Sequence, residues 1–334
     1  MKAYVKAISS YLPSNVLDNS AIAHKFPEWS AEKVAKKLGI NQRHIAGENE
    51  FSSDMAISAA KKLFEEHSIN PNDIDFVIFC TQSPDYFLPT TACIIQDKLN
   101  IPTSAGAMDF NLGCSGYVYG LAIAKGLICA GVAKNILFLT AETYSKYLHP
   151  SDKSNMTIFG DGATATLVSD EGFGEILNFS LGSDGSGAEN LIVKSGGIKL
   201  RDKLNDLQFD DKGNPISSDF LYMNGSEIFN FTLEMVPILV DNTLLKNNIN
   251  LDKINYFVFH QANNYLLGFL RKKIKIPEEK FLHYIEDVGN TVSSTIPLTI
   301  ENYLNNKTLR GNVLLAGFGV GYSWGGTIIK IDTI

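Results

Sequence analysis

An internal repeat constrains the fold of this chain more than any other feature of its sequence. The segment INPNDIDFVIFC at 69–80 aligns without a gap on INLDKINYFVFH at 249–260, with identical residues at Ile69, Asn70, Ile74 and Phe79. Each copy follows a candidate amphipathic helix, at 54–67 and 227–246, and ends in an apolar run typical of a buried strand. KNILFLTAE near 134–142 likewise resembles GNVLLAGFG at 311–319. The sequence therefore predicts an α/β protein with two copies of a βαβα unit.

Hydrophobic periodicity predicts matching elements in both halves. In the first half, strands are expected near 2–9, 75–81, 105–110, 135–141 and 162–169, and helices near 54–67, 90–99 and 114–130. In the second half, strands are expected near 174–181, 254–259, 312–317 and 322–331, and helices near 224–247, 263–273 and 293–305. Residues 182–224, rich in Gly, Ser and Asp, read as loops or a cap. We place the two units at 1–172 and 173–334.

Composition narrows the class of protein. The 334 residues exceed what one small core needs, and a net charge of -7 argues against a general nucleic-acid binder. The N-terminus has no signal-like core, and no apolar run approaches the ~20 residues that span a bilayer. We therefore expect a cytoplasmic protein that binds neither nucleic acid nor membrane. The 4 cysteines lack the CxxC spacing of a metal site or redox dithiol, so we expect free thiols.

Cys114 is the first candidate for chemistry. In DFNLGCSGYVYGL it lies between Gly113 and Gly116, where a strand ends and a helix begins. The positive end of the helix and nearby backbone N–H groups favour the thiolate, which is the nucleophilic form. Glycines permit close backbone approach. The alternative is a buried, inert cysteine.

Two polar residues of the second half are candidate partners. His260 ends the repeated strand and corresponds to Cys80 of the first half, and Asn290 follows Gly289 in a loop before a helix capped by serine or threonine. Sites of α/β sheets form at the carboxyl ends of strands, so a site at the seam would draw residues from both halves. The alternatives are a structural histidine and a turn asparagine.

The glycine-rich segment AGFGVGYSWGG at 316–326 does not fit the pattern of a dinucleotide-binding loop. Its third glycine is at the wrong offset, and a strand follows where a helix is required. A strand junction of this kind can direct backbone N–H groups at a developing oxyanion.

Together, GCSG, HQAN, GNTVSS and GFGVGYSWG resemble the β-ketoacyl-acyl-carrier-protein synthase III family. SSYLP, GINQRHIA, FGDGA and MNGSEIF extend the likeness over nearly the whole chain. The resemblance implies the thiolase fold, with duplicated halves in five layers, α-β-α-β-α, and a homodimer. It also implies an acyltransferase that takes an acyl group from acyl-CoA or an acyl-carrier-protein. The acyl group is then joined to malonyl-acyl-carrier-protein with loss of carbon dioxide, which starts fatty-acid synthesis.

The resemblance also assigns roles to residues. Cys114 would be the acylated nucleophile, and the backbone N–H groups of Cys114 and Val320, beside Gly319, would form the oxyanion hole. His260 and Asn290 would hydrogen-bond the malonyl thioester carbonyl, and Phe318 would shield the site. No metal and no cofactor beyond the CoA thioester substrate is implied. The remaining substrate-binding positions would be Trp29, Lys37, Leu88, Lys153, Ile158, Gly225 and Asn263, and carrier-protein docking would involve Lys272 and Lys273.

Three positions depart from the family pattern. Lys37 and Lys153 replace arginines that clamp the CoA nucleotide, and lysine lacks the planar fork that grips phosphate. CoA binding is then weaker, or the donor is a carrier protein. Leu88 replaces a phenylalanine that limits the acyl pocket across the dimer interface, which would admit a starter larger than acetyl. Two alternatives stay open: transfer to another acceptor, as in secondary metabolism, and a non-catalytic acyl or carrier-protein binding module.

Overall fold

The computed structural model describes residues 2–211, 213–306 and 309–331, and within them the same strand order occurs twice. The first run is β5 (Gly106–Phe110), β4 (Phe76–Cys80), β6 (Asn135–Glu142), β7 (Gly162–Ser169) and β1 (Tyr4–Tyr11). The second is β15 (Phe281–Leu282), β14 (Tyr256–Phe259), β16 (Gly311–Gly319), β17 (Ser323–Ile331) and β8 (Gly174–Ile176). In each run the first two pairings are parallel and the last two antiparallel. The repeat read from the sequence is therefore a repeat of the fold.

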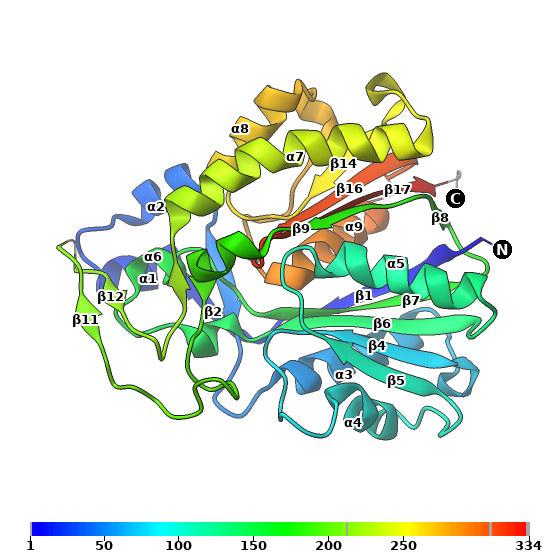
Figure 1. Cartoon of the computed structure of the whole chain (residues 1–334), viewed down its shortest axis with the longest axis horizontal. Coiled ribbons are helices and arrows are strands. Elements are labelled where there is room, and N and C mark those ends of the chain that lie inside the picture. Colours follow the sequence, from blue (N-terminus) through cyan, green and yellow to red (C-terminus); the bar gives the residue numbers. More distant parts are fainter. Residues whose placement is uncertain (1, 212, 307–308, 332–334) are drawn as a thin grey trace.

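Helices and sheets alternate in five layers, which Figure 1 shows stacked across the molecule. The helices are α3 (Ser52–Glu66) and α4 (Thr91–Lys98) on the outer face of the first sheet, α5 (Gly116–Cys129) and α9 (Thr295–Asn305) between the sheets, and α7 (Gly225–Asn247) and α8 (Asn264–Ile274) on the outer face of the second. This is the α-β-α-β-α arrangement expected from the sequence.

Helix α5 forms much of the middle layer because it is apolar on nearly all sides. It contacts strands of both sheets, and its side chains Tyr117, Val118 and Leu121 are fully buried. Gly120 lets the helix approach β6 closely, since a Cβ there would lie 2.0 Å from Cζ of Phe138. The Tyr117 and Phe138 rings stack with their centroids 5.4 Å apart. One core is thus shared by the two repeats.

Strand β8 connects the two sheets. It pairs with β1 at Tyr4 and Val5 and with β17 at residues 329–331, so the hydrogen-bonded path runs unbroken from β15 to β5. The single strand expected at 174–181 is two, β8 and β9 (Ser180–Ser183), and β9 pairs with β17 further along. Strand β8 begins just after the predicted boundary but pairs with a strand of each half, so the sheet does not mark where one unit ends. The division into 1–172 and 173–334 stays a prediction.

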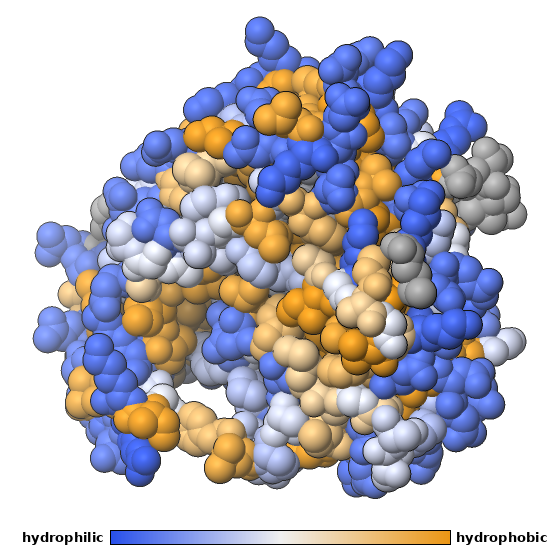
Figure 2. All heavy atoms as spheres, turned by 45° about the vertical axis from the view of Figure 1, so that its right-hand side comes forward, coloured by the Kyte–Doolittle hydropathy of each residue, from blue (hydrophilic) through white to orange (hydrophobic). Residues whose placement is uncertain are grey.

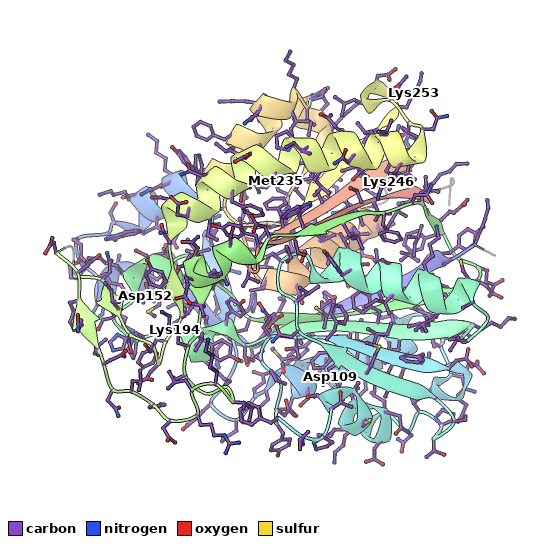
Figure 3. The ribbon with its side chains drawn as sticks, in the orientation of Figure 1. Asp109, Asp152, Lys194, Met235, Lys246 and Lys253 are labelled. Atoms are coloured by element: carbon purple, nitrogen blue, oxygen red, sulfur yellow. The ribbon has the colours of Figure 1, made fainter. Side chains whose placement is uncertain are left out.

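A charged side chain fixes the start of α4. Asp109, labelled in Figure 3, lies on β5, and its carboxylate accepts hydrogen bonds from the backbone N–H groups of Thr91 (2.5 Å) and Ala92 (2.6 Å). An anion suits the positive end of a helix. This contact ties the helix to the strand that leads to Cys114.

Helix α7 is the one helix of the described ranges that is long and apolar enough to cross a membrane. It packs on β9, β16 and β17, and Phe231, Val236 and Val240 are buried there. It therefore occupies the place of a core helix in the fold.

Two regions hold elements that the sequence did not predict. Between residues 12 and 50 lie β2 (Asn15–Asp18), α1 (Asn19–Lys25), α2 (Ala31–Leu38) and β3 (Gln42–Ile45). In and near the predicted loop segment 182–224 lie β10 (Leu191–Ile192), β11 (Gln208–Phe209), β12 (Pro215–Ile216) and β13 (Tyr222–Met223). Short helices are α6 (Lys153–Met156) and 3-10 turns at Pro71–Asp73, Tyr144–Tyr147, Gly185–Asn190, Leu251–Lys253, Glu278–Lys280 and Val292–Ser294. The strands and 3-10 turns among them are too short to show a clear period, whereas α2 is amphipathic, with Val34 and Leu38 buried, and was missed.

Candidate active site

Three chain segments bring Cys114, His260 and Asn290 to one buried cavity of about 170 Å³. Cys114 lies between β5 and α5, His260 directly follows β14, and Asn290 precedes the turn at Val292–Ser294. Their exposed fractions are only 7%, 2% and 5%. One residue comes from the first repeat and two from the second, as a site at the seam requires. We call this space the catalytic cavity.

The sulfur of Cys114 is a thiol at neutral pH. Burial and the negative charge of Glu142 raise the pKa of Cys114 to about 12, although hydrogen bonds from the backbone N–H groups of Val320 and Cys114 lower it. The sequence predicted a thiolate, and for the free protein this prediction is wrong. Desolvation raises the pKa of the thiol by more than the positive end of the helix lowers it. The two N–H groups lie against the sulfur, and donors beside the nucleophile are close to where the oxygen of a bound acyl group would develop its charge.

Gly319 is required where the end of β16 passes the sulfur. A Cβ at this position would lie 2.9 Å from both Cβ and Sγ of Cys114. No larger residue fits without moving the backbone that carries the Val320 N–H group.

His260 is a neutral imidazole. Burial lowers its pKa to about 3, although a hydrogen bond with the Val292 backbone raises it. Nδ1 lies 2.8 Å from Oγ1 of Thr295, whose hydroxyl donates to the Val292 carbonyl at 3.0 Å. While that hydroxyl hydrogen is used on Val292, Nδ1 carries the ring hydrogen and Nε2 is an acceptor. When the hydroxyl donates to Nδ1 instead, Nε2 becomes a donor.

The amide of Asn290 is held in one orientation. Its Oδ1 accepts a hydrogen bond from the backbone N–H of Val292 at 2.9 Å, so Nδ2 is the group left to donate. Its backbone bonds to Ile158 and Gly160 on the neighbouring segment. Ser294 is the N-cap of α9 as expected, but its hydroxyl contacts Thr140 Oγ1 at 2.8 Å in place of a capping bond.

The sequence reasoning missed Glu142. This carboxyl is fully buried and accepts hydrogen bonds from the Gln82 backbone N–H (3.0 Å) and Ser293 Oγ (2.9 Å). Burial raises its pKa to about 8, although these hydrogen bonds lower it. The signal was a charged residue ending the apolar strand KNILFLTAE, at the repeat position that Gly319 occupies in the second half.

A second, larger cavity of about 740 Å³ adjoins the catalytic cavity, and Tyr144 and Leu191 line both. We call it the outer cavity. Figure 2 shows the molecule hollowed, with hydrophobic side chains along the hollow. Its described wall is mostly apolar and includes Leu221 and Val320.

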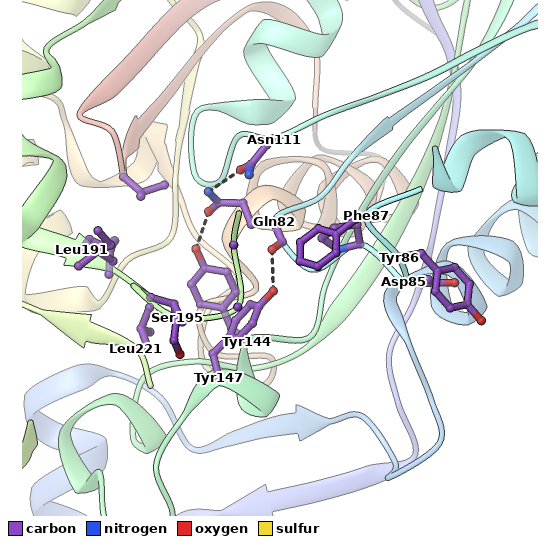
Figure 4. A pocket seen from close by; sticks show the side chains of 16 residues that line it. Gln82, Asp85, Tyr86, Phe87, Asn111, Tyr144, Tyr147, Leu191, Ser195 and Leu221 are labelled. Carbon is purple, nitrogen blue, oxygen red and sulfur yellow. Dashed lines mark hydrogen bonds between the residues drawn. The ribbon is translucent and has the colours of Figure 1, made fainter. Parts of the chain in front are cut away.

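One wall of the outer cavity is polar and held by a chain of hydrogen bonds (Figure 4). Gln82 accepts from Tyr144 Oη at its Oε1 (2.5 Å) and from Tyr147 Oη at its backbone carbonyl (2.8 Å), and its Nε2 donates to Asn111 Oδ1 (2.9 Å). The Gln82 side chain also packs on Gly113, beside Cys114.

The other predicted site residues divide into three groups. Phe318, Gly319, Ile158, Gly225 and Asn263 line the catalytic cavity, and the Phe318 ring lies edge-on to His260 with centroids 5.8 Å apart. Near its rim, Trp29 packs in the same cluster as Ile158, with Lys37 Nζ 5.9 Å from the indole, and Lys153 pairs with Glu28 at 3.0 Å.

The last group lies outside the cavities. Leu88 is 85% exposed and lines neither cavity in a single copy of the chain, whereas its neighbours Tyr86 and Phe87 line the outer one. Lys272 and Lys273 lie in the last turn of α8, and Lys273 Nζ donates to the Leu233 carbonyl at 2.7 Å. Across the described ranges no group of three or more His, Cys, Asp or Glu side chains could hold a metal ion.

Comparison with known proteins identifies the family. Residues 108–185 match the model of 3-oxoacyl-[acyl-carrier-protein (ACP)] synthase III, and residues 244–331 match its C-terminal model. A β-ketoacyl-[acyl-carrier-protein] synthase III of Clostridium perfringens is 36% identical over 96% of this chain and 97% of its own length. The chain belongs to the β-ketoacyl-acyl-carrier-protein synthase III family. An enzyme of the same name from Clostridioides difficile is also 36% identical, over 98% of both chains.

Solved structures agree with this assignment. A crystal structure of a 3-oxoacyl-(acyl-carrier-protein) synthase III matches with a TM-score of 0.97 and 49% identity, covering 99% of this chain and 100% of the other. A synthase from Burkholderia xenovorans matches with a TM-score of 0.91 and 37% identity, covering 100% of this chain and 95% of the other. The thiolase fold expected from the sequence is confirmed.

Replacing Glu142 by Gln should make Cys114 more reactive above pH 8. The carboxylate charge raises the pKa of the thiol, and the amide removes that charge while its oxygen still accepts from the Gln82 N–H. We expect alkylation of Cys114 by iodoacetamide, followed by peptide mass spectrometry, to be roughly tenfold faster at pH 9. Below a pH of about 8 the wild-type carboxyl is protonated and the difference should shrink. Glu234→Gln, on the exposed side of α7, is the matched control, and equal profiles for all three proteins would contradict the coupling.

Proposed function

We propose that this chain catalyses acyl transfer to Cys114, followed by decarboxylative condensation with malonyl-acyl-carrier-protein. The observation that carries the proposal is the catalytic cavity, where a thiol with two backbone donors shares one buried space with His260 and Asn290. The family membership supports a condensing enzyme at the start of fatty-acid synthesis.

In the first half-reaction, Cys114 Sγ attacks the carbonyl carbon of the acyl thioester. Because its pKa is high, the thiol loses its proton only as the new C–S bond forms, and the neutral imidazole of His260 accepts that proton transiently at Nε2. The N–H groups of Cys114 and Val320 stabilise the oxyanion. The new C–S bond forms, the old C–S bond breaks, and the departing thiolate takes the proton from His260.

In the second half-reaction, malonyl thioester binds with its carbonyl oxygen on His260 and Asn290. The bond to the carboxylate carbon breaks, carbon dioxide leaves, and the electron pair forms an enolate whose oxygen accepts from Nε2–H of His260 and Nδ2 of Asn290. Each donor contributes ~3 kcal/mol, as in other oxyanion holes. The enolate carbon attacks the acyl-Cys114 carbonyl, and the released Cys114 thiolate takes up a proton.

The substrates enter past Ile158, Gly225 and Asn263. Trp29, Lys37 and Lys153 bind a CoA nucleotide when the acyl donor is a CoA thioester. Lys272 and Lys273 attract an acidic carrier protein, an attraction that salt weakens. We further propose a cytoplasmic homodimer that needs no metal or cofactor beyond its CoA thioester substrate.

The outer cavity accepts the starter acyl group. It adjoins the catalytic cavity at Tyr144 and Leu191 and includes Val320, whose N–H group serves the oxyanion. Its volume of about 740 Å³ far exceeds the space that an acetyl group needs, and its wall is largely apolar. We therefore propose a starter larger than acetyl, with Leu88 of a second copy bordering the cavity.

Acylation should depend on Cys114. Incubation with radiolabelled acyl-CoA or acyl-carrier-protein should label the wild-type protein and leave Cys114→Ala unlabelled, because the Cys114 sulfur is the nucleophile that lies against the two N–H donors. Cys129→Ala, which removes an exposed thiol, is the control and should label normally. Equal labelling of Cys114→Ala and wild type would exclude this mechanism and favour a binding module.

Decarboxylation should depend on two donors, the imidazole of His260 and the side-chain amide of Asn290. His260→Ala and Asn290→Ala should each release carbon dioxide from malonyl-acyl-carrier-protein at least about a hundredfold more slowly than wild type. Carbon dioxide is measured as released radiolabel. Normal release from both variants would contradict these two roles, and no release from the wild type would favour transfer of the acyl group to another kind of acceptor.

The starter should be larger than acetyl. In a panel of acyl-CoA and acyl-carrier donors, mass spectrometry of Cys114 should show octanoyl or larger groups loaded at least as fast as acetyl. Val193→Phe, which fills the outer cavity, should slow octanoyl loading about tenfold or more and leave acetyl loading within about twofold. Preference for acetyl in both proteins would overturn the assignment of this cavity.

A further inference from the structure

Thr232 carries a buried hydroxyl that has no partner in the described protein. It lies on α7, is 1% exposed, and its Oγ1 makes no hydrogen bond. An unpaired buried hydroxyl destabilises the folded state. Such a group is expected to meet a partner that is not part of the chain.

A second buried threonine on the same helix has a hydrogen-bond partner, whereas Thr232 has none. Thr243 is also buried, and its Oγ1 donates to the carbonyl of Leu239, four residues back, at 2.7 Å. Thr232 has the carbonyl of Ile228 at the same spacing but makes no bond to it. Its hydroxyl is therefore turned away from the local acceptor that threonines in helices commonly use.

Thr232 belongs to the wall of the catalytic cavity. Gly225, Ile228, Phe229 and Thr232 follow one another at helical spacing along α7, and all line this cavity. Leu266 of α8 and Phe318 line it as well, so Thr232 is a polar group in a largely apolar wall.

Four of the other polar side chains of this wall already have a role. Asn263 uses its Oδ1 to cap α8 through the Leu266 N–H at 2.9 Å. Cys114, His260 and Asn290 serve the thioester carbonyls in the proposed function. The hydroxyl of Thr232 is left for a polar group that follows the thioester into the cavity.

We propose that Thr232 hydrogen-bonds an amide of the pantetheine arm that carries the thioester. This inference rests on the proposed function. Amide groups lose their water when the arm enters an apolar passage, and each one needs a partner there. The arm is common to CoA and to carrier proteins, so Thr232 serves both half-reactions. It positions the substrate and takes no part in bond making.

Thr232→Val tests the proposal because valine keeps the shape and removes the hydroxyl. We expect kcat/KM to fall roughly threefold to tenfold for acyl-CoA, acyl-carrier and malonyl-carrier substrates alike. Labelling of Cys114 by an S-ethyl acyl thioester, which lacks the amides, should be unchanged. Thr232→Ser should restore activity, and the Tm of Thr232→Val should equal or exceed that of wild type, because no protein bond is lost.

Thr243→Val is the matched control. It removes a satisfied hydroxyl from the same helix, so its Tm should fall while kcat/KM of the folded protein stays at the wild-type value. Three results would overturn the proposal: unchanged kcat/KM in Thr232→Val, an equal loss with the amide-free thioester, or a loss confined to one half-reaction.

Binding without catalysis separates this inference from the proposed function. Calorimetry with unacylated CoA and with the pantetheine-bearing carrier protein is carried out on Cys114→Ala, with and without Thr232→Val. A weaker Kd for both ligands in the double variant supports the contact even if Cys114 never becomes acylated. Equal Kd values would overturn the contact even if acylation occurs.

Discussion

Helix α5 is buried between two sheets, and that position determines the chemistry of the cysteine at its start. The helix can lie there only because it is apolar on nearly every side and because Gly120 lets it approach Phe138. Cys114 is carried into the same interior, where loss of water raises the pKa of its thiol. The buried thiol is surrounded by the groups that the chemistry needs. These are the backbone donors of Val320 and Cys114, the glycine at 319 and the imidazole of His260.

The site contains little charge at neutral pH. Cys114 is a thiol, His260 is a neutral imidazole, and burial raises the pKa of Glu142 to about 8. Condensation forms an oxyanion in one half-reaction and an enolate in the other. In a dry cavity without a fixed charge beside them, neutral donors such as backbone N–H groups and an amide stabilise these anions more strongly than they would in water.

The sequence predicted the parts of the fold that follow regular periods. Most of the repeated strands and the flanking helices were expressed in hydrophobic patterns that recur in both halves, whereas the five layers were implied by the family resemblance. The strands of two to four residues, such as β2, β3 and β15, were missed because they show almost no period. Cys114, His260 and Asn290 could be named because glycine-flanked and strand-end motifs are local. The protonation state of Cys114 could not, since it depends on how much water the folded interior excludes. Glu142 was missed for the same reason: its effect acts through space across three segments.

The pairing of β8 with both β1 and β17 has a consequence for motion. A protein whose reacting groups come from two repeats could lose their alignment if the repeats rotated against each other. Here such a hinge would have to break the backbone pairing of β8 with β1 or with β17 as well as the packing of the shared helices. The pairing therefore ties the two repeats together at the edge where the sheets meet.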